Sequence, residues 1–273
     1  MIKVWMGLLL VFASFGLAEL DEVGVFDESI GFENEKKFEN TSKVIHIIVA
    51  LCDNKYQGIV PVGAKIGNGQ DPDNNLYWGC AYGIRSYFKK SAEWKFLKVE
   101  KKKGNILERI YFQHKTKDVY LIADAYDGQF IKKATEDFLA ANAGSKKETV
   151  DIDGKSLGIY GHAQLVSYIG HDGLMDFTVD SDYKNVDGKQ RDCIILACMS
   201  RNFFKTYIKN ANSRPLVWTT QLMAPEAYTI HDAISGWLLG ETPKQIHTRA
   251  AKAYAKYQKC SIAAASKLLV TGF

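Results

Sequence analysis

The sequence predicts an α/β fold, a three-layer sandwich in which a mostly parallel central sheet lies between helices. Segments with the pattern of strands alternate with helical segments from residue 44 to residue 240, an order typical of parallel sheets with right-handed crossovers. Residues 44–52 (VIHIIVALC) form a nearly continuous β-branched run, as expected for a strand buried on both faces. The chain has 273 residues, 47% hydrophobic and 24% charged, a composition that fits a globular domain with a sizeable core.

The first half of the chain begins with this strand and a long loop over residues 53–75, which is rich in Gly, Asn and Asp. Long loops in compact domains are often functional. Residues 76–97 carry aromatic and apolar residues at helical spacing, which predicts one helix packed on the sheet. The charged run 98–104 is expected to be a solvated turn. The next predicted elements are strands at 109–114 and 118–126 and an amphipathic helix at 128–144 that ends at Gly144 in a left-handed cap.

The second half begins with a polar, hairpin-like stretch over residues 148–161. A small excursion over residues 175–190, with a turn at Asp187-Gly188, separates two apolar strands. We assign residues 44–240 to one α/β domain and residues 241–273 to a C-terminal helical extension packed on it. The remaining predicted elements are strands at 163–173, 192–200 and 215–223, helices at 201–213 and 224–240, and one or two Ala-rich helices at 242–273.

The N-terminus has the features of a secretory signal peptide. A basic residue, Lys3, precedes an apolar run, and small residues at Gly16 and Ala18 suit a cleavage site. The apolar run of about 15 residues is shorter than the roughly 20 that a transmembrane helix needs. The sequence therefore predicts a signal peptide at 1–18, a polar segment at 19–43, a secreted or periplasmic protein, and no stable membrane insertion after cleavage near Ala18.

The charge balance argues against nucleic acid as a partner. Removal of residues 1–18 takes away Lys3 and no acidic residue, so that 35 basic against 31 acidic residues become 34 against 31, a formal net charge of +3. Nucleic-acid-binding domains usually have a strongly basic balance.

The five cysteines are an odd number, so at least one thiol stays unpaired in an oxidising compartment. A buried structural thiol would explain the remainder, because Cys is among the most buried residue types. A reactive thiol would explain it equally well. The cysteines are Cys52, Cys80, Cys193, Cys198 and Cys260.

His171 and Cys198 follow two successive predicted strands, where each strand ends. Neighbouring strands lie about 4.8 Å apart, so the two side chains can meet at the carboxyl edge of a parallel sheet, where α/β proteins bind ligands. An imidazole beside a thiol can take up its proton and later protonate a leaving amine. Glycines on both sides of the histidine, Gly170 and Gly173, would allow close approach of a substrate and offer N–H groups to an oxyanion.

This pattern resembles that of caspase-like cysteine peptidases, which include caspases, gingipains, legumains, separases and CHAT domains. The resemblance implies a caspase-like fold, a peptide or protein substrate, Cys198 as nucleophile and His171 as general acid and base, with no cofactor. It also implies an oxyanion hole of backbone N–H groups near Gly173 and Cys198. Asp172 stands between His171 and Gly173, which moves the expected donor one residue along the chain. The resemblance covers five strands, at 44–52, 119–126, 163–171, 193–198 and 215–223.

Two acidic residues at strand ends, Asp53 and Asp124, are weaker candidates for a substrate pocket that would favour a basic residue. A turn-capping role is the simpler interpretation of Asp53. A non-catalytic binding module on the same scaffold remains an alternative to the peptidase. A metal site is a lesser alternative, because His162 and His171 are nine residues apart across an extended strand and cannot share one ion without a bend. We therefore predict no metal, although plausible ligand types occur at His162, His171, Asp172, Asp176 and Cys198.

Overall fold

The computed structural model describes residues 40–273. The predicted signal peptide and the polar segment up to residue 39 lie outside the described residues. Within the described part, no helix is long and apolar enough to cross a membrane.

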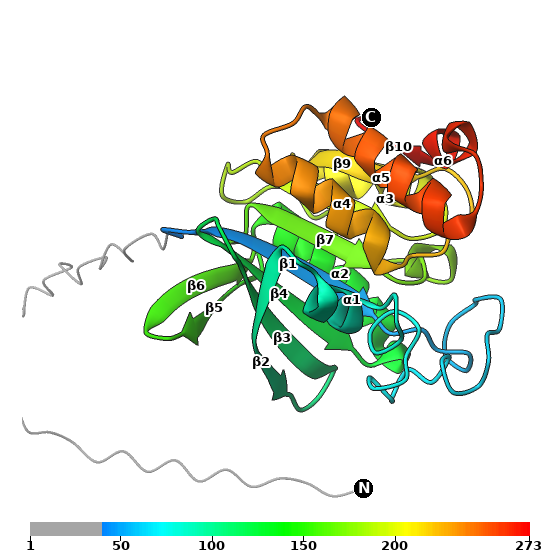
Figure 1. The fold of residues 1–273 in the computed structure, drawn as a ribbon, viewed down its shortest axis with the longest axis horizontal. Coiled ribbons are helices and arrows are strands. Elements are labelled where there is room, and N and C mark those ends of the chain that lie inside the picture. The colour runs from blue at the N-terminus through cyan, green and yellow to red at the C-terminus, as the bar shows by residue number, and fades with distance from the viewer. Residues whose placement is uncertain (1–39) are drawn as a thin grey trace, which may run out of the picture. The chain divides into compact units, whose positions relative to one another are not determined.

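An eight-stranded sheet organises the fold, in the order β10-β9-β8-β7-β1-β4-β3-β2 (Figure 1). A separate two-stranded hairpin, β5–β6, extends away from this sheet. The strands are β1 (Lys43–Ala50), β2 (Trp94–Lys101), β3 (Ile106–His114), β4 (Val119–Tyr126), β5 (Lys147–Ile152), β6 (Lys155–Tyr160), β7 (Leu165–Ile169), β8 (Asp192–Leu196), β9 (Arg214–Thr219) and β10 (Leu269–Val270).

Five adjacent strands, β4-β1-β7-β8-β9, are parallel and form the centre of the sheet. The strands outside them, β3 and β2 at one edge and β10 at the other, pair antiparallel. The chain goes from β1 to its neighbour β4 on one side and later to β7 on the other, so the strand order reverses at β1. In such sheets the crevice at the carboxyl ends of the strands beside the reversal is the usual ligand site.

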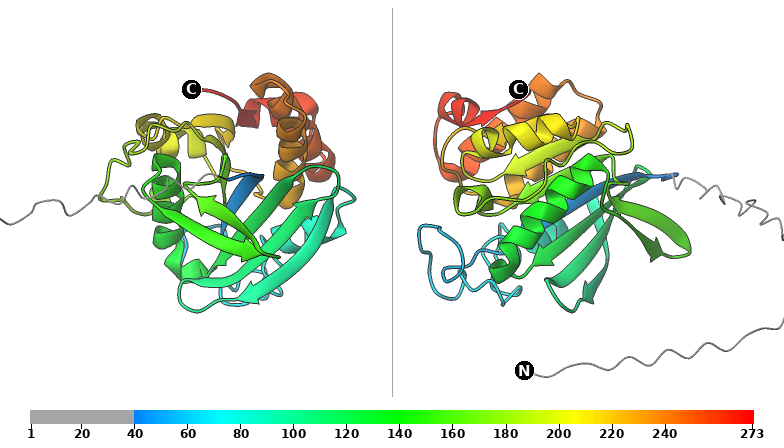
Figure 2. Two further views of the ribbon diagram at one scale, coloured as in Figure 1. Left: turned by 90° about the vertical axis from the view of Figure 1, so that its left-hand side faces the viewer. Right: turned by 180° about the vertical axis from the view of Figure 1, so that it is seen from behind.

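Helices cover both faces of the sheet (Figure 2), because alternate residues of each central strand point to opposite sides. Ile45, Ile47 and Val49 of β1 belong to the core beneath α1, α4 and α5. Val44 and Ile48 belong to the core beneath α2 and α3. The prediction of a three-layer α/β arrangement with a mostly parallel sheet is confirmed at this level. The helices are α1 (Ile84–Lys90), α2 (Ile131–Ala143), α3 (Ser200–Asn210), α4 (Ala227–Leu238), α5 (Pro243–Gln258) and α6 (Ile262–Leu268), with single 3₁₀ turns η1 (Gly128–Phe130) and η2 (Gly173–Met175).

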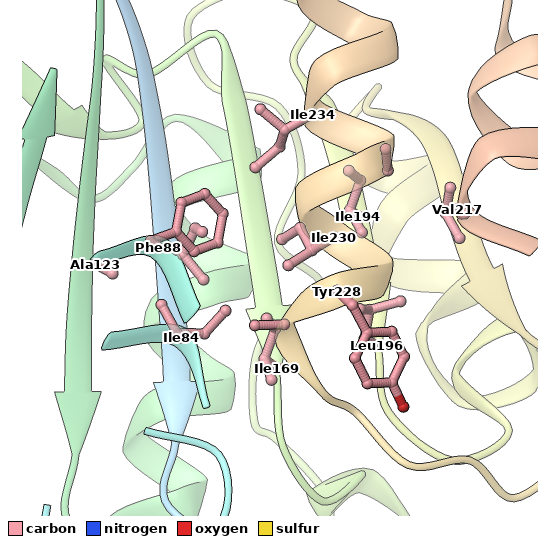
Figure 3. Packing of buried hydrophobic residues seen from close by; sticks show 14 of the residues in the cluster. Ile84, Phe88, Ala123, Ile169, Ile194, Leu196, Val217, Tyr228, Ile230 and Ile234 are labelled. Atoms are coloured by element: carbon pink, nitrogen blue, oxygen red, sulfur yellow. The ribbon is translucent and has the colours of Figure 1, made fainter. Parts of the chain in front are cut away.

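Packing on the α1/α4 face is dominated by branched aliphatic side chains. Figure 3 shows Ile230 and Ile234 of α4 beside Ile169 of β7 and Ile194 of β8. Phe88 of α1 packs on the same face of the sheet, on the β1 side of β7. These contacts hold the end of β7, and hence the residues that follow it, against a rigid layer.

The prediction of one helix over residues 76–97 is wrong. Only Ile84–Lys90 is helical, and Trp94–Lys101 forms β2, so the run 98–104 also begins inside a strand. The N–H groups of Trp78, Gly79 and Cys80 all donate to the carbonyl of Asn75, which closes a turn before the helix. Pairing with β3 then favours the extended form over the helical spacing of the sequence, because tertiary context overrides local propensity.

The C-terminal segment belongs to the same compact unit as the rest of the described chain. Ile246, Ala250 and Ala251 of α5 are buried in the α1/α4 core. β10 adds the last strand of the sheet by pairing with β9. Residues 241–273 thus contribute a helix to the α1/α4 layer and an edge strand to the sheet.

Candidate active site

A cavity of about 570 Å³ opens at the carboxyl ends of β7 and β8. Its wall combines the loop after β1, the turns after β7 and β8, the segment after β9 and the end of α5. The lining residues are Gly58, Ile59, Val60, Val62, Leu76, Tyr77, Gly170, His171, Met175, Cys198, Leu222, Met223, Ala224, Pro225, Glu226 and Gln258. The structure therefore brings His171 and Cys198 to one cavity.

His171 reaches the cavity through a sharp turn at Gly170, which has a φ of +150°. A Cβ atom at this position would lie 2.8 Å from the carbonyl oxygen of Ala50, so the turn requires glycine. The His171 residue is only 6% exposed. Its carbonyl accepts a hydrogen bond from the Tyr168 hydroxyl at 2.9 Å, which anchors the turn to β7.

Asp176 holds the His171 ring. Its Oδ2 lies 2.7 Å from Nε2 of the imidazole and also accepts the N–H of Gly58 at 3.0 Å. With Nε2–H donating to the carboxylate, Nδ1 is the unprotonated nitrogen, as a general base requires. Asp176 therefore orients the imidazole.

Cys198 lies in the turn between β8 and α3, and several hydrogen bonds fix this turn. The next residue, Met199, has a left-handed φ of +50°, an uncommon conformation for a non-glycine residue. Its N–H donates to the Gln221 carbonyl at 2.9 Å. Ser200, the first residue of α3, donates from its hydroxyl to the Ile195 carbonyl at 3.1 Å.

The Cys198 thiol is only partly exposed, and burial raises its pKa. The N–H of Met223, 3.4 Å from Sγ, favours the thiolate, whereas the charge of Asp172 disfavours it. Among the described residues, no hydrogen bond joins Sγ to the His171 ring. The two groups thus share the cavity wall, with the sulfur as a thiol that needs a base before it can attack.

Asp172 and Gly173 follow His171 but do not line the cavity. Asp172 caps the 3₁₀ turn by accepting the Leu174 N–H at 3.0 Å, and its Oδ2 is buried without a hydrogen-bond partner among residues 40–273. Burial raises the pKa of this carboxyl to about 7. Gly173 packs against Phe177 so closely that a Cβ would lie 2.4 Å from its ring. Of the predicted oxyanion donors, Gly170 and Cys198 are at the cavity wall, and the N–H of Gly170 already donates to the Leu196 carbonyl at 3.3 Å.

Asp53 and Asp124 do not line the cavity either. Asp53 is buried and caps a turn, since its Oδ1 accepts the N–H groups of Lys55 at 2.8 Å and Tyr56 at 3.1 Å. Asp124 lies inside β4, fully buried, between His46 at 3.1 Å and Arg109 at 2.6 Å. These partners hold its pKa below the usual range despite its burial. Both carboxylates have structural partners that account for them.

The residues that sequence reasoning missed come from the loops. From the sequence, Asp176 is only a possible metal ligand, although it lies five residues after His171 and a single turn of 3₁₀ helix suffices to bring it back to the ring. Met223 and Glu226 follow β9, and no sequence motif marks them as residues of the site. Among the described residues, no group of three or more His, Cys, Asp or Glu side chains could hold a metal ion. The five cysteines are all free thiols, and Cys198 alone lines this cavity.

Comparisons of the chain with protein-family models, with curated proteins and with solved structures found no match.

Proposed function

We propose that the protein is a cysteine-dependent peptidase of caspase-like fold that acts after export, with Cys198 as nucleophile and His171 as general acid and base. The observation that carries the proposal is the placement of both side chains on one cavity at the carboxyl ends of adjacent parallel strands. A large concave pocket that contains a nucleophile and a base is the usual starting point for assigning an active site.

The sheet supports the caspase-like part of the proposal. The five strands that carry the resemblance are the five parallel strands at the centre of the sheet. His171 follows the third of them along the chain and Cys198 the fourth, as the resemblance requires.

The chemistry begins with transfer of the Cys198 proton to Nδ1 of His171. Sγ then attacks the carbonyl carbon of a peptide bond, and the carbonyl π electrons move to oxygen. When the tetrahedral intermediate collapses, the C–N bond breaks and His171 returns the proton to the leaving amine. Water, deprotonated by the same imidazole, hydrolyses the thioester and restores the thiol.

Asp176 supports each proton transfer. Its carboxylate, 2.7 Å from Nε2, stabilises the imidazolium that forms when His171 accepts a proton. The N–H of Cys198 is directed to no acceptor within residues 40–273 and lies beside the reacting sulfur, so it is the first candidate donor to the oxyanion.

A peptide acyloxymethyl ketone tests the proposal, because it alkylates an activated thiol only after occupying the substrate site. We expect labelling of the wild type, none of Cys198→Ala, and slow labelling of His171→Ala. The matched control is Cys80→Ala, which removes a partly buried thiol outside the cavity and should label like the wild type. Equal labelling of wild type and Cys198→Ala would contradict the assignment. The N-terminal sequence of the secreted protein tests export, with cleavage expected after Ala18.

The second candidate is a binding module that uses the same cavity without chemistry. Two observations favour this alternative. Burial raises the pKa of Cys198, and within residues 40–273 no hydrogen bond joins its Sγ to the imidazole of His171. Peptide binding without labelling of Cys198 would identify this alternative.

A further inference from the structure

The wall of the cavity at Cys198 is mostly apolar, and its apolar side chains come from two separate segments of the chain. Ile59, Val60 and Val62 belong to the loop after β1, and Leu222 and Met223 belong to the segment after β9. A volume of about 570 Å³ is within the size range of ligand pockets. The cavity can therefore bury more than the one side chain next to the scissile bond.

Three of these lining side chains are unusually exposed for their type. Val60 is 80%, Leu222 64% and Met175 39% exposed. Apolar surface gathered around one opening is unfavourable in water and marks a binding site more often than chance. A ligand with apolar side chains would cover this surface, whereas a polar ligand would leave the unfavourable exposure in place.

The charged side chains of the wall disfavour an acidic ligand. Glu226 is the only carboxylate in the lining, and no Lys or Arg of the described chain takes part in it. Oε2 of Glu226 already accepts hydrogen bonds from the Tyr228 hydroxyl at 2.7 Å and from Gln258 at 3.2 Å. An acidic side chain in the cavity would face Glu226, and no Lys or Arg of the lining could pair with it.

We infer that the cavity selects peptides with large uncharged apolar side chains, such as leucine or norleucine, on the acyl side of the scissile bond. The inference deepens the proposed function and relies on it for the position of the scissile bond. Selection comes from the apolar rim around Val60 and Leu222, and rejection of acidic residues comes from Glu226.

Binding to Cys198→Ala tests the inference without any need for catalysis. Three peptides that differ at one residue are compared by calorimetry: norleucine, lysine, which has the same carbon stem with an ammonium group, and aspartate. We expect norleucine to bind at least tenfold more tightly than lysine, and aspartate to bind least. Equal or tighter binding of lysine would overturn the inference, because Glu226 would then select a basic residue. Equal binding of all three, or no binding, would overturn it as well.

A pair of variants ties the preference to the rim. Leu222→Gln, combined with Cys198→Ala, should weaken binding of the norleucine peptide several-fold. Leu239→Gln is the matched control, because Leu239 is 61% exposed against 64% for Leu222 but lies outside the cavity. Both substitutions are at exposed positions and should leave the circular dichroism spectrum unchanged. Equal losses in the two variants would refute a role of the rim.

The same peptides, converted to acyloxymethyl ketones, separate the two proposals. Discrimination between peptides without labelling of Cys198 would refute the peptidase and retain the apolar selectivity. Labelling of Cys198 at equal rates by all three would retain the peptidase and refute the selectivity.

Discussion

Replacement of Asp172 by asparagine should stabilise the protein at neutral and alkaline pH. The side chain is fully buried, and its Oδ2 has no hydrogen-bond partner in the part of the chain that the structure describes. Asparagine has nearly the same shape and keeps an oxygen for the N–H of Leu174. The substitution therefore removes the charge while it preserves the cap of the 3₁₀ turn.

The magnitude follows from the pKa of Asp172, which burial raises to about 7 from an ordinary value of 3.8. At 1.36 kcal/mol per pKa unit, ionisation inside the fold costs up to about 4 kcal/mol. The asparagine amide, with its own hydrogens unpaired, costs about 1–3 kcal/mol. A net gain of about 1–3 kcal/mol at pH 8 remains.

The sign of the pH dependence is fixed by the raised pKa. Between pH 3.8 and about 7 the folded state keeps the proton that the unfolded state has lost, so stability falls as pH rises through this window. The advantage of Asp172→Asn should therefore be absent or reversed at pH 4 and complete at pH 8.

Urea denaturation at pH 4, 6 and 8 measures this difference. Asp180→Asn is the matched control, because it makes the same change at a side chain that is 92% exposed, and it should shift stability little at any pH. An advantage of Asp172→Asn that does not change between pH 4 and pH 8 would refute the reasoning.

Three further substitutions test the site and its support. Asp176→Asn should slow alkylation of Cys198 by a peptide ketone about ten- to a hundredfold, because the imidazolium loses its carboxylate; an unchanged rate would exclude the orienting role. Gly170→Ala should lower the free energy of unfolding in urea by about 1–3 kcal/mol, against about 1 kcal/mol or less for Gly188→Ala, whose φ of +70° is also positive but whose surroundings are open. Asp124→Asn should cost about 3 kcal/mol, because it leaves the buried Arg109 with Glu148 as its remaining carboxylate partner, while peptide selectivity in the folded fraction stays unchanged; altered selectivity would restore a substrate-pocket role.

The sequence predicts correctly those features of the fold and the site that depend on single strands and on the residues at their ends. Residues 44–52 are apolar throughout, and the strand they form lies at the centre of the sheet. The ends of parallel strands meet at one edge of the sheet, and this rule was enough to bring His171 and Cys198 to one cavity.

The sequence does not predict those features that depend on contacts between segments far apart along the chain. Trp94 and its neighbours have helical spacing, but they pair with β3. The contact of Asp176 with both His171 and Gly58 depends on where a loop of the other half of the chain lies. The displacement of Gly173 from the cavity follows from its packing against Phe177, which the pattern after the strand does not reveal.

The link from Gly58 to Asp176 joins the loop after β1 to the imidazole through one backbone N–H. A methyl group at Gly58 would lie 2.6 Å from Oδ1 of Asp176 and would push the carboxylate from the ring. Val60, two residues away, is 80% exposed. On the proposed function, a change at Val60 should alter which peptides bind, whereas a change at Gly58 should alter the reaction rate for every peptide alike.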